Sequence, residues 1–344
     1  MRFLFVVSGK DVPSTRFRIL PYLPLLEAAG HTCDVAYSFP QKYDELPIIG
    51  WRLSQALKRT VRHWHVFAAS RKKYDTIVIE REVYDNDSSV IEEKLRKFTS
   101  RLVLDVDDGV FLLYPEKFDR VARLCDAAIS GNRWITDYVS PLCPVVEQIP
   151  TCVKLSDYTL SPTQKHSTQP CIGWIGTTHN VAFLKVAAAG LRTAAHEIPF
   201  KLLVIAPSDE KLAEIDLSGI EIDFRTWSPK MEVDAIREMD IGLMPLPTGE
   251  EWMKYKCGLK LIQYLSLGIP GISTPIGINA EILDGNRVGR AATNDHDWEE
   301  AILELLRNPS LRQQLGTAGR QLVESEYSIE GNLARFEQVL TGDT

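Results

Sequence analysis

Residues 252–275 have the sequence WMKYKCGLKLIQYLSLGIPGISTP. This pattern predicts an approach loop, a nine-residue helix and an abrupt end that leads into a buried strand. Gly268 suits the left-handed position just past the end of a helix, and Pro270 prevents the helix from continuing. A helix followed at once by a buried strand is the repeating unit of α/β folds.

The start of this helix has the composition of an anion site. If the helix begins near Cys257–Gly258, Lys260 and Gln263 share one face, and Lys256 lies on the same side. Free backbone N–H groups and the positive end of the helix dipole lie there too. Gly258 removes a side chain where a ligand would approach. The pattern favours a phosphate, and more specifically a diphosphate; the alternative is an ordinary lysine-rich helix with a solvated face.

Length and composition indicate a two-domain soluble protein. At 344 residues the chain is too long for one ordinary core, and its 44% hydrophobic and 25% charged content is typical of globular proteins. The net charge of −7 argues against a general nucleic-acid binder.

Cysteine usage and the first residues indicate the compartment. The six cysteines form no CxxC pair and no cluster with histidine, which predicts free thiols in the cytoplasm. The N-terminal MRFLFVVSGKD is apolar for too few residues to be a signal peptide, and it predicts a first buried strand. The apolar runs are shorter than a transmembrane helix requires.

Short apolar strands alternate with helices along the whole chain, which predicts parallel sheets covered by helices on both faces. The predicted strands are Phe3–Val7, His31–Tyr37, Thr76–Glu80, Leu102–Val106, Ala127–Ser130, Cys171–Ile175, Phe200–Ile205, Ile220–Phe224, Ile241–Met244 and Gly271–Ser273. Besides the opening helix, the predicted helices are Phe17–Ala29, Val181–Ala195, Asp297–Leu306, Ser310–Glu324 and Ile329–Leu340.

The polar, proline-containing segment 161–170 is the best linker candidate. The sequence therefore predicts two doubly wound Rossmann-like α/β domains, 1–165 and 166–326, that face a cleft. A final helix within 327–344 is free to cross back to the first domain. Ligands of such sheets bind at the carboxyl ends of the strands.

The second half resembles the GT-B glycosyltransferases, specifically the large retaining group known as family 4. The resemblance is carried by the segments Asp240–Pro245, Trp252 to Tyr264 with the pattern WxxxKCGxKxxQY, Gly268-Ile-Pro, Thr274 to Glu281 and Tyr327-Ser328. In the first half, Ser14-Thr15-Arg16, Asp105-Val-Asp-Asp108, Gly131-Asn132 and Ile149-Pro-Thr151 are similar to one bacterial subgroup.

The chain departs from this family at two places. The family has two glutamates separated by seven residues, and here Tyr255 and Gln263 stand at those positions. The family's usual basic pair after the first strand of the C-terminal domain is replaced by Gly176-Thr-Thr-His-Asn180. Gln263 is able to hydrogen-bond a ribose diol without charge assistance, and Lys256 and Lys260 are candidates to neutralise the diphosphate.

The resemblance implies a metal-independent enzyme, with no cofactor, that moves a sugar from a nucleotide-sugar donor to an acceptor with retention of configuration. The acceptor, held by the N-terminal domain, is a glycan, a lipid-linked molecule or a small molecule. The residues expected to bind the donor are Gly176, Thr177, Lys256, Cys257, Gly258, Leu259, Lys260 and Gln263. Two other functions stay open, a nucleotide-sugar epimerase and a non-catalytic nucleotide-sugar-binding protein.

Asp107 and Asp108 follow a predicted strand, and with Lys260 they are the candidate catalytic residues. We expect the two aspartates to line the acceptor side near the reacting sugar. One alternative is a metal site of the other common glycosyltransferase fold; another is a solvated strand end with an aspartate cap. Arg16, Arg18 and Glu281 are candidates for the acceptor side, with helix capping as the alternative for the loop around Arg16 and for Glu281.

Residues 48–73 combine apolar and basic side chains. Apolar residues at 53, 57, 61 and 64 have helical spacing, which favours a helix with an apolar core face and a basic solvent face. The alternative is a surface helix that contacts anionic lipid or a lipid-linked acceptor. The predicted location is therefore the cytoplasm, with peripheral association to the membrane in the second case.

Overall fold

The computed structural model describes residues 1–160 and 169–343, and the chain divides into two compact units. Unit 1 comprises Met1–Cys152 and Ile329–Thr344, and unit 2 comprises Val153–Ser328. The division falls at 152/153 rather than at the predicted 165/166. The predicted linker 161–170 lies almost entirely outside the described residues.

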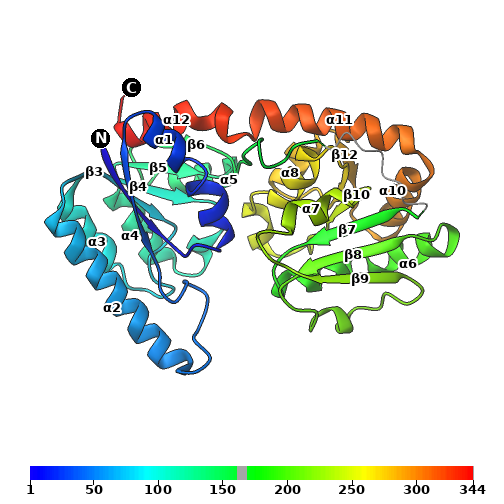
Figure 1. Ribbon diagram of the computed structural model, residues 1–344, viewed down its shortest axis with the longest axis horizontal. Helices are drawn as coiled ribbons and strands as arrows, with labels where there is room; N and C mark the ends of the chain where they lie inside the picture. Colours follow the sequence, from blue (N-terminus) through cyan, green and yellow to red (C-terminus); the bar gives the residue numbers. More distant parts are fainter. Residues whose placement is uncertain (161–168, 344) are drawn as a thin grey trace. The chain divides into compact units, whose positions relative to one another are not determined.

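Unit 1 is built on a six-stranded parallel sheet (Figure 1). The five strands expected from the sequence are present, and the short β6 is an addition. The order across the sheet is β2 (Thr32–Tyr37), β1 (Arg2–Val7), β3 (Tyr74–Glu80), β4 (Thr99–Val106), β5 (Ala127–Ser130) and β6 (Val146–Gln148). The strand order reverses between β1 and β3, which is where doubly wound sheets bind ligands.

The helices of unit 1 differ from the prediction. The expected helix Phe17–Ala29 is interrupted by a turn around Pro21, which cannot donate a backbone hydrogen bond. The helical segments are η1 (Thr15–Ile19), α1 (Leu23–Ala28), α2 (Gly50–Arg71), α3 (Val90–Leu95), η2 (Arg96–Phe98), η3 (Val110–Leu112), α4 (Pro115–Leu124), α5 (Arg133–Val139) and α12 (Ile329–Thr341). The prediction did not include α3, α4 and α5.

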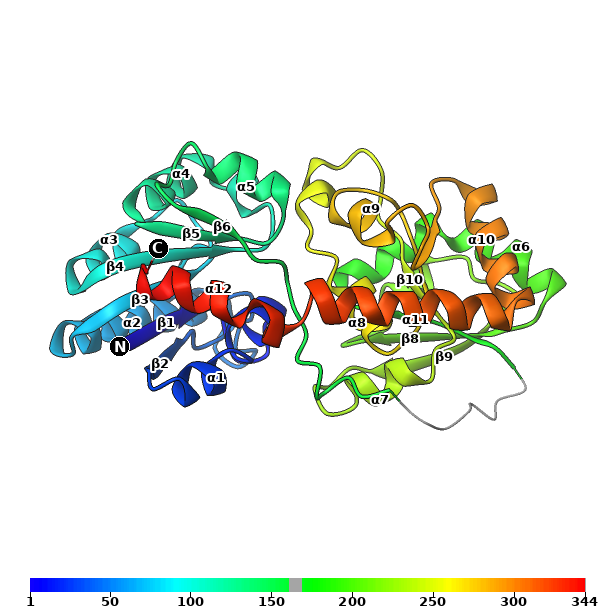
Figure 2. The same cartoon turned by 90° about the horizontal axis from the view of Figure 1, so that it is seen from above.

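The last helix, α12, packs into the core of unit 1 beside strands from the start of the chain (Figure 2). The ring of Phe336 stacks on that of Tyr22 at a centroid distance of 4.1 Å and an interplanar angle of 6°. The Thr76 hydroxyl donates to the carbonyl oxygen of Leu340 at 2.7 Å. The C-terminal helix therefore contributes part of the core that covers the sheet of unit 1.

Unit 2 is a second six-stranded parallel sheet. Its order is β12 (Gly289–Ala291), β11 (Gly271–Ser273), β10 (Ile241–Met244), β7 (Cys171–Ile175), β8 (Lys201–Ala206) and β9 (Glu221–Thr226). The strand order reverses between β7 and β10. The helical segments are η4 (His179–Val186), α6 (Ala188–Glu197), η5 (Leu212–Glu214), α7 (Glu232–Arg237), η6 (Glu251–Tyr255), α8 (Leu259–Ser266), α9 (Ile278–Leu283), α10 (Asp295–Arg307) and α11 (Pro309–Glu326).

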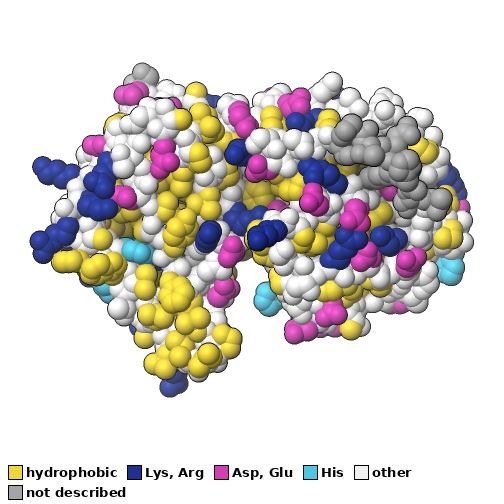
Figure 3. All heavy atoms as spheres, viewed as in Figure 1, with side chains coloured by type: hydrophobic (Ala, Val, Ile, Leu, Met, Phe, Trp, Pro, Cys, Tyr) yellow, Lys and Arg dark blue, Asp and Glu magenta, His cyan; other side chains and the backbone are white. Residues whose placement is uncertain are grey.

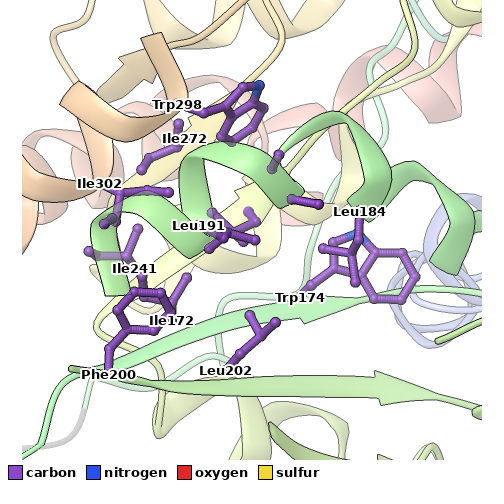
Figure 4. Packing of buried hydrophobic residues seen from close by; sticks show 14 of the residues in the cluster. Ile172, Trp174, Leu184, Leu191, Phe200, Leu202, Ile241, Ile272, Trp298 and Ile302 are labelled. Atoms are coloured by element: carbon purple, nitrogen blue, oxygen red, sulfur yellow. The ribbon is translucent and has the colours of Figure 1, made fainter. Parts of the chain in front are cut away.

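The core of unit 2 is closed by close contact between two helices. Trp298 of α10 and Leu191 of α6 are fully buried in the cluster that covers β7 and β8 (Figure 4). A Cβ atom at Gly190 would lie 2.6 Å from the Cβ of Trp298 and 2.8 Å from the amide nitrogen of Glu299. Only glycine permits this approach of α6 to α10.

The favoured interpretation of residues 48–73 is wrong. The polar side chains of Ser54, Lys58 and Arg62 are buried on the inner face of α2, whereas Leu53 and Trp64 are exposed. Hydrophobic side chains consequently gather on the surface along this helix (Figure 3). The helical spacing of the apolar residues is real, but it marks the outer face.

We expect Phe336→Ala to destabilise unit 1 by about 3–5 kcal/mol, because it removes a fully buried ring that stacks on Tyr22. The matched control is Phe67→Ala, the same change at an exposed ring, which should shift stability by no more than about 0.5 kcal/mol. Urea unfolding monitored by circular dichroism measures both. Equal effects of the two substitutions would show that α12 contributes no core to unit 1.

Candidate functional site

The candidate donor site begins at the N-terminus of α8. As the sequence predicts, the helix starts at Leu259, directly after Gly258. Gly258 has φ of +66°, and a Cβ atom there would lie 2.5 Å from Cδ1 of Ile282. The left-handed backbone and the absence of space both require glycine. The start of α8 is thereby fixed directly after this glycine.

Tyr264 places α8 at the point where the strand order reverses. Its hydroxyl accepts from the amide of Ile175 in β7 at 3.3 Å and donates to the carbonyl oxygen of Leu243 in β10 at 3.1 Å. The ring packs on Gly242, where a Cβ atom would lie 2.2 Å away. One buried side chain therefore ties α8 to both strands of the switch point, the place where α/β sheets bind ligands.

The structure brings Lys260 and the loop after β7 together. A Cβ atom at Gly176 would lie 3.0 Å from Cε of Lys260 and 2.5 Å from the ring of Trp174. The Lys260 ammonium lies 5.6 Å from the centroid of the Trp174 ring, within the range of a cation–π contact. Thr177 follows in the same loop and is exposed. A lysine, a glycine loop and a helix N-terminus thus meet, which is the composition expected of a phosphate site.

Lys256 and Cys257 complete the entrance to α8. Lys256 is half-buried, and the Cys257 side chain is buried just before the Gly258 cap. The preceding segment lies close to the backbone of Gly277. A Cβ atom at Gly277, where φ is +57°, would lie 2.3 Å from the carbonyl oxygen of Lys254, so this approach requires glycine. The position of the loop therefore depends on a glycine that lies about twenty residues further along the chain.

Gln263 is buried rather than open to solvent. Its amide nitrogen donates to Oε1 of Glu232 at 2.9 Å and to the hydroxyl of Tyr158 at 3.0 Å. Because an ionised Glu232 carboxylate only accepts hydrogen bonds, the Gln263 NH₂ group has to face it, which defines the direction of the amide oxygen. The other Glu232 oxygen accepts from Nε1 of Trp227 at 2.7 Å.

Tyr255, like Gln263, contacts a carboxylate. Its hydroxyl donates to Oε1 of Glu251 at 3.3 Å. At both positions where the resemblance leads one to expect a glutamate, a carboxylate from elsewhere in the sequence therefore lies in hydrogen-bond contact. Glu251 is four residues from Tyr255, a detectable helical spacing. Glu232 is 31 residues from Gln263, and no sequence pattern connects the two.

Glu281 lies on the exposed side of α9 in unit 2. It was predicted for the acceptor side, which the sequence assigns to the other unit. Nearby, the Asn279 side chain donates to the Ser273 hydroxyl at 3.0 Å, and this bond holds the start of α9 against β11.

In unit 1, hydrogen bonds attach the loop after β1 to Glu80 at the end of β3. The Glu80 carboxylate accepts from the hydroxyls of Ser14 and Thr15 and from the amide of Ser8 at 3.2 Å. Arg16, on the same segment, is half-buried, and its guanidinium carbon lies 5.0 Å from the centroid of the Phe17 ring. This buried carboxylate shapes the loop at the switch point of the first sheet.

Arg18 is buried and forms an ion pair with Asp105 at 2.6 Å. It also donates to the carbonyl oxygen of Ile149 at 3.1 Å. Burial raises the pKa of Asp105 to about 6, while the charge of Arg18 opposes that rise. These contacts make Arg18 a structural residue near the carboxyl end of β4. Its burial argues against the contact with an acceptor that the sequence predicts.

Arg81, which the sequence analysis did not single out, organises the aspartates after β4. Its Nε donates to Oδ1 of Asp107 at 2.5 Å, and its Nη2 lies 3.8 Å from Oδ2 of Asp108. The backbone of Arg81 has φ of +55°, which is uncommon for a non-glycine residue. Burial tends to raise the pKa of Asp107, but the charge and hydrogen bond of Arg81 hold it below its usual value. Both carboxylates therefore face a fixed cation.

Within the described residues, no group of three or more histidine, cysteine, aspartate or glutamate side chains is placed to hold a metal ion. All six cysteines are free thiols, as the sequence predicts.

Comparison with known proteins agrees with this geometry. Residues 169–308, which include β7, α8 and β11, match the family model described as glycosyl transferases group 1. Unit 2 matches the group 1 glycosyltransferases. The predicted α/β architecture of two doubly wound sheets is confirmed, and the whole chain has the GT-B fold.

Similar solved structures cover nearly the entire chain. Sucrose-phosphate synthase from Thermosynechococcus elongatus has a TM-score of 0.73 at 15% identity, with 98% of each chain covered. A glycosyltransferase from Rickettsia africae has a TM-score of 0.73 at 12% identity, covering 99% of this chain and 98% of that one. Anabaena HepE in complex with UDP-glucose has a TM-score of 0.67 at 13% identity, covering 99% and 100%. No curated protein matches the sequence.

We expect Gln263→Glu to destabilise this GT-B protein, and to do so more strongly at pH 8 than at pH 5. The new carboxyl would be buried beside Glu232, and both effects raise its pKa above that of the unfolded chain. A raised pKa in the folded state means that the penalty is present at high pH and disappears as the pH falls through that pKa.

Urea unfolding of wild type and variant at several pH values measures this difference. Gln263→Leu is the control, because it removes the same hydrogen bonds, at a cost of about 1–3 kcal/mol, without adding a charge. Its stability deficit should vary with pH less than that of Gln263→Glu, because it only removes one donor from Glu232 and adds no second buried carboxyl. If the two variants show the same pH profile, the Glu232 contact does not determine the amide at position 263.

Proposed function

We propose that this protein is a glycosyltransferase that moves a sugar from a nucleotide-sugar donor to a hydroxyl acceptor. The observation that carries the proposal is the meeting of Lys260, the Gly176 loop and the glycine-capped N-terminus of α8 at the switch point of the second sheet. This site lies inside the segment that matches the group 1 family.

In this proposal the diphosphate of the donor is bound by charge and by backbone amides. Lys256 and Lys260 neutralise its negative charge, while the amides around Gly258 donate hydrogen bonds to its oxygens. The charge that develops on the leaving diphosphate is stabilised by the same groups, and no metal ion is required. Gln263 is the proposed partner of a ribose hydroxyl through its amide oxygen, which has to become accessible to the ligand because the side chain is buried against Glu232 and Tyr158.

We assign the acceptor to unit 1, with Asp107 and Asp108 as substrate-contacting residues. Because Arg81 keeps the pKa of Asp107 below its usual value, this carboxylate is a weak base at neutral pH. Its proposed role is therefore to accept a hydrogen bond from an acceptor or donor hydroxyl and to orient it, rather than to remove its proton. The resemblance to family 4 favours a product with the anomeric configuration of the donor.

A panel of UDP-, GDP-, ADP- and TDP-sugars tested by thermal shift identifies the donor. UDP-glucose is the first choice, because HepE, which shares the fold, has been crystallised with it. A ligand present at 100 times its dissociation constant should add about 2.7 kcal/mol of stability.

Product analysis then separates the candidate functions. A glycosyltransferase slowly releases nucleoside diphosphate and sugar even without acceptor, and EDTA should not change the rate. An epimerase would yield an isomerised nucleotide sugar, whereas a binding protein would leave the donor intact. Either of the last two results would replace the proposal.

We expect Lys256→Ala and Lys260→Ala each to weaken binding of the nucleoside diphosphate by about 10- to 100-fold, since each removes a charge-assisted contact of about 1.5–3 kcal/mol. Isothermal titration calorimetry measures the affinity. Lys254→Ala is the matched control, because Lys254 is an exposed lysine of the same loop. Unchanged affinity in the double variant Lys256→Ala/Lys260→Ala would place the diphosphate elsewhere.

A further inference from the structure

The outer face of α2 exposes large apolar side chains. Trp64 is 63% exposed, Leu53 is 60% exposed and Phe67 is 47% exposed. Leu53, Leu57, Trp64 and Phe67 fall within about one third of the helix circumference at 100° per residue, so they form one stripe. Ile48, which is 97% exposed, continues the apolar surface just before the helix. Figure 3 shows hydrophobic side chains gathered on the surface over α2.

The inner face of α2 explains why these side chains point outward. The Arg62 guanidinium donates to the carbonyl oxygens of Val7 and Ala36 at 2.7 and 2.9 Å. The Lys58 ammonium donates to the carbonyl oxygen of Lys42 at 2.7 Å, and the Ser54 hydroxyl accepts from the amide of Leu46 at 2.9 Å. The helix is attached to unit 1 through polar contacts to the ends of strands and loops. Only the small apolar residues Val66 and Ala69 share this buried face, and the larger apolar side chains of the stripe lie outside the core.

Basic residues accompany the apolar stripe. Arg52, Arg59 and His63 lie side by side on the helix, next to the apolar residues, and all three are exposed. Arg71, at the end of the stripe, lies 5.0 Å above the ring of Phe67, and Lys72 and Lys73 follow it. The 22 residues of α2 contain no aspartate or glutamate, although the chain as a whole has a net charge of −7.

We propose that α2 docks the protein on the surface of a membrane that contains anionic lipids. The apolar stripe, including Trp64, would enter the level of the lipid headgroups, and the neighbouring arginines would contact phosphate groups. Charge favours this occupant over a second copy of the chain, because two α2 surfaces would meet with the same positive sign. The contact is peripheral, since no helix among the described residues is long and apolar enough to cross a bilayer.

This inference does not depend on the proposed sugar transfer, and its test needs no substrate. The full-length protein is sedimented with vesicles of phosphatidylcholine alone and of phosphatidylcholine with 30% (roughly one third) phosphatidylglycerol. We expect binding to the anionic vesicles, much weaker binding to the neutral ones, and a decrease when NaCl is raised, because salt screens the attraction. Hydrogen exchange should show that the vesicles protect residues 48–67.

Two double variants separate the apolar and the basic contributions. Trp64→Ala/Phe67→Ala should lower the partition coefficient for anionic vesicles by at least about tenfold. Arg52→Gln/Arg59→Gln should lower it by about 25-fold, at roughly fivefold for each arginine, and should reduce the salt dependence. The matched controls are Val145→Ala/Ile222→Ala and Arg123→Gln/Arg287→Gln, which alter exposed side chains on other elements. They should bind like wild type.

Three results would overturn the proposal. The first is no binding to either kind of vesicle, and the second is equal loss of binding in the α2 variants and their controls. The third is a concentration-dependent dimer, seen by analytical ultracentrifugation, that Trp64→Ala/Phe67→Ala dissociates, since a second copy would then cover the face. Circular dichroism and thermal melting check that the variants are folded. All four substituted positions on α2 are exposed, so the fold should not depend on them.

Discussion

The candidate donor site depends on one buried hydrogen-bonding side chain, Tyr264. Its hydroxyl joins β7 to β10, the two strands between which the order of the second sheet reverses, and its ring occupies the space that Gly242 leaves open. Since Tyr264 belongs to α8, these bonds also set where the N-terminus of that helix lies. The approach of Lys260 to Gly176 follows from this arrangement, because both lie at the ends of the elements that Tyr264 connects.

The structure gives a physical reason why Tyr255 and Gln263 stand where the family pattern has glutamates. Carboxylates are present beside both positions, but they come from Glu251 and Glu232. With Glu232 buried against position 263, an amide there satisfies the carboxylate, whereas a second carboxylate would repel it. The chain therefore lacks the two glutamates of the family pattern, but other carboxylates lie next to the same positions.

In unit 1, buried carboxylates at and beyond the ends of β3 and β4 are paired with hydrogen-bond donors. Glu80, Asp105 and Asp107 each meet a hydroxyl or an arginine, and Arg81 takes a left-handed backbone conformation to do so. Such pairing rigidifies a site because a buried carboxylate without its partner would be costly. In contrast, α2 attaches to unit 1 largely through buried polar side chains and leaves its large apolar residues Leu53, Trp64 and Phe67 exposed.

The sequence alone determined the repeated strand–helix order, the start of α8 after Gly258 and its end before Gly268, because these depend on local periodicity and backbone freedom. It also predicted the residues of the candidate phosphate site. Only the tertiary structure decided that Glu232 lies beside Gln263, that Arg81 pairs with Asp107 and that Phe336 completes the core of unit 1. It likewise reversed the orientation of α2. Periodicity identifies a stripe of apolar residues, but which face is buried depends on the groups that the rest of the fold presents, here backbone carbonyl oxygens that require Arg62 and Lys58.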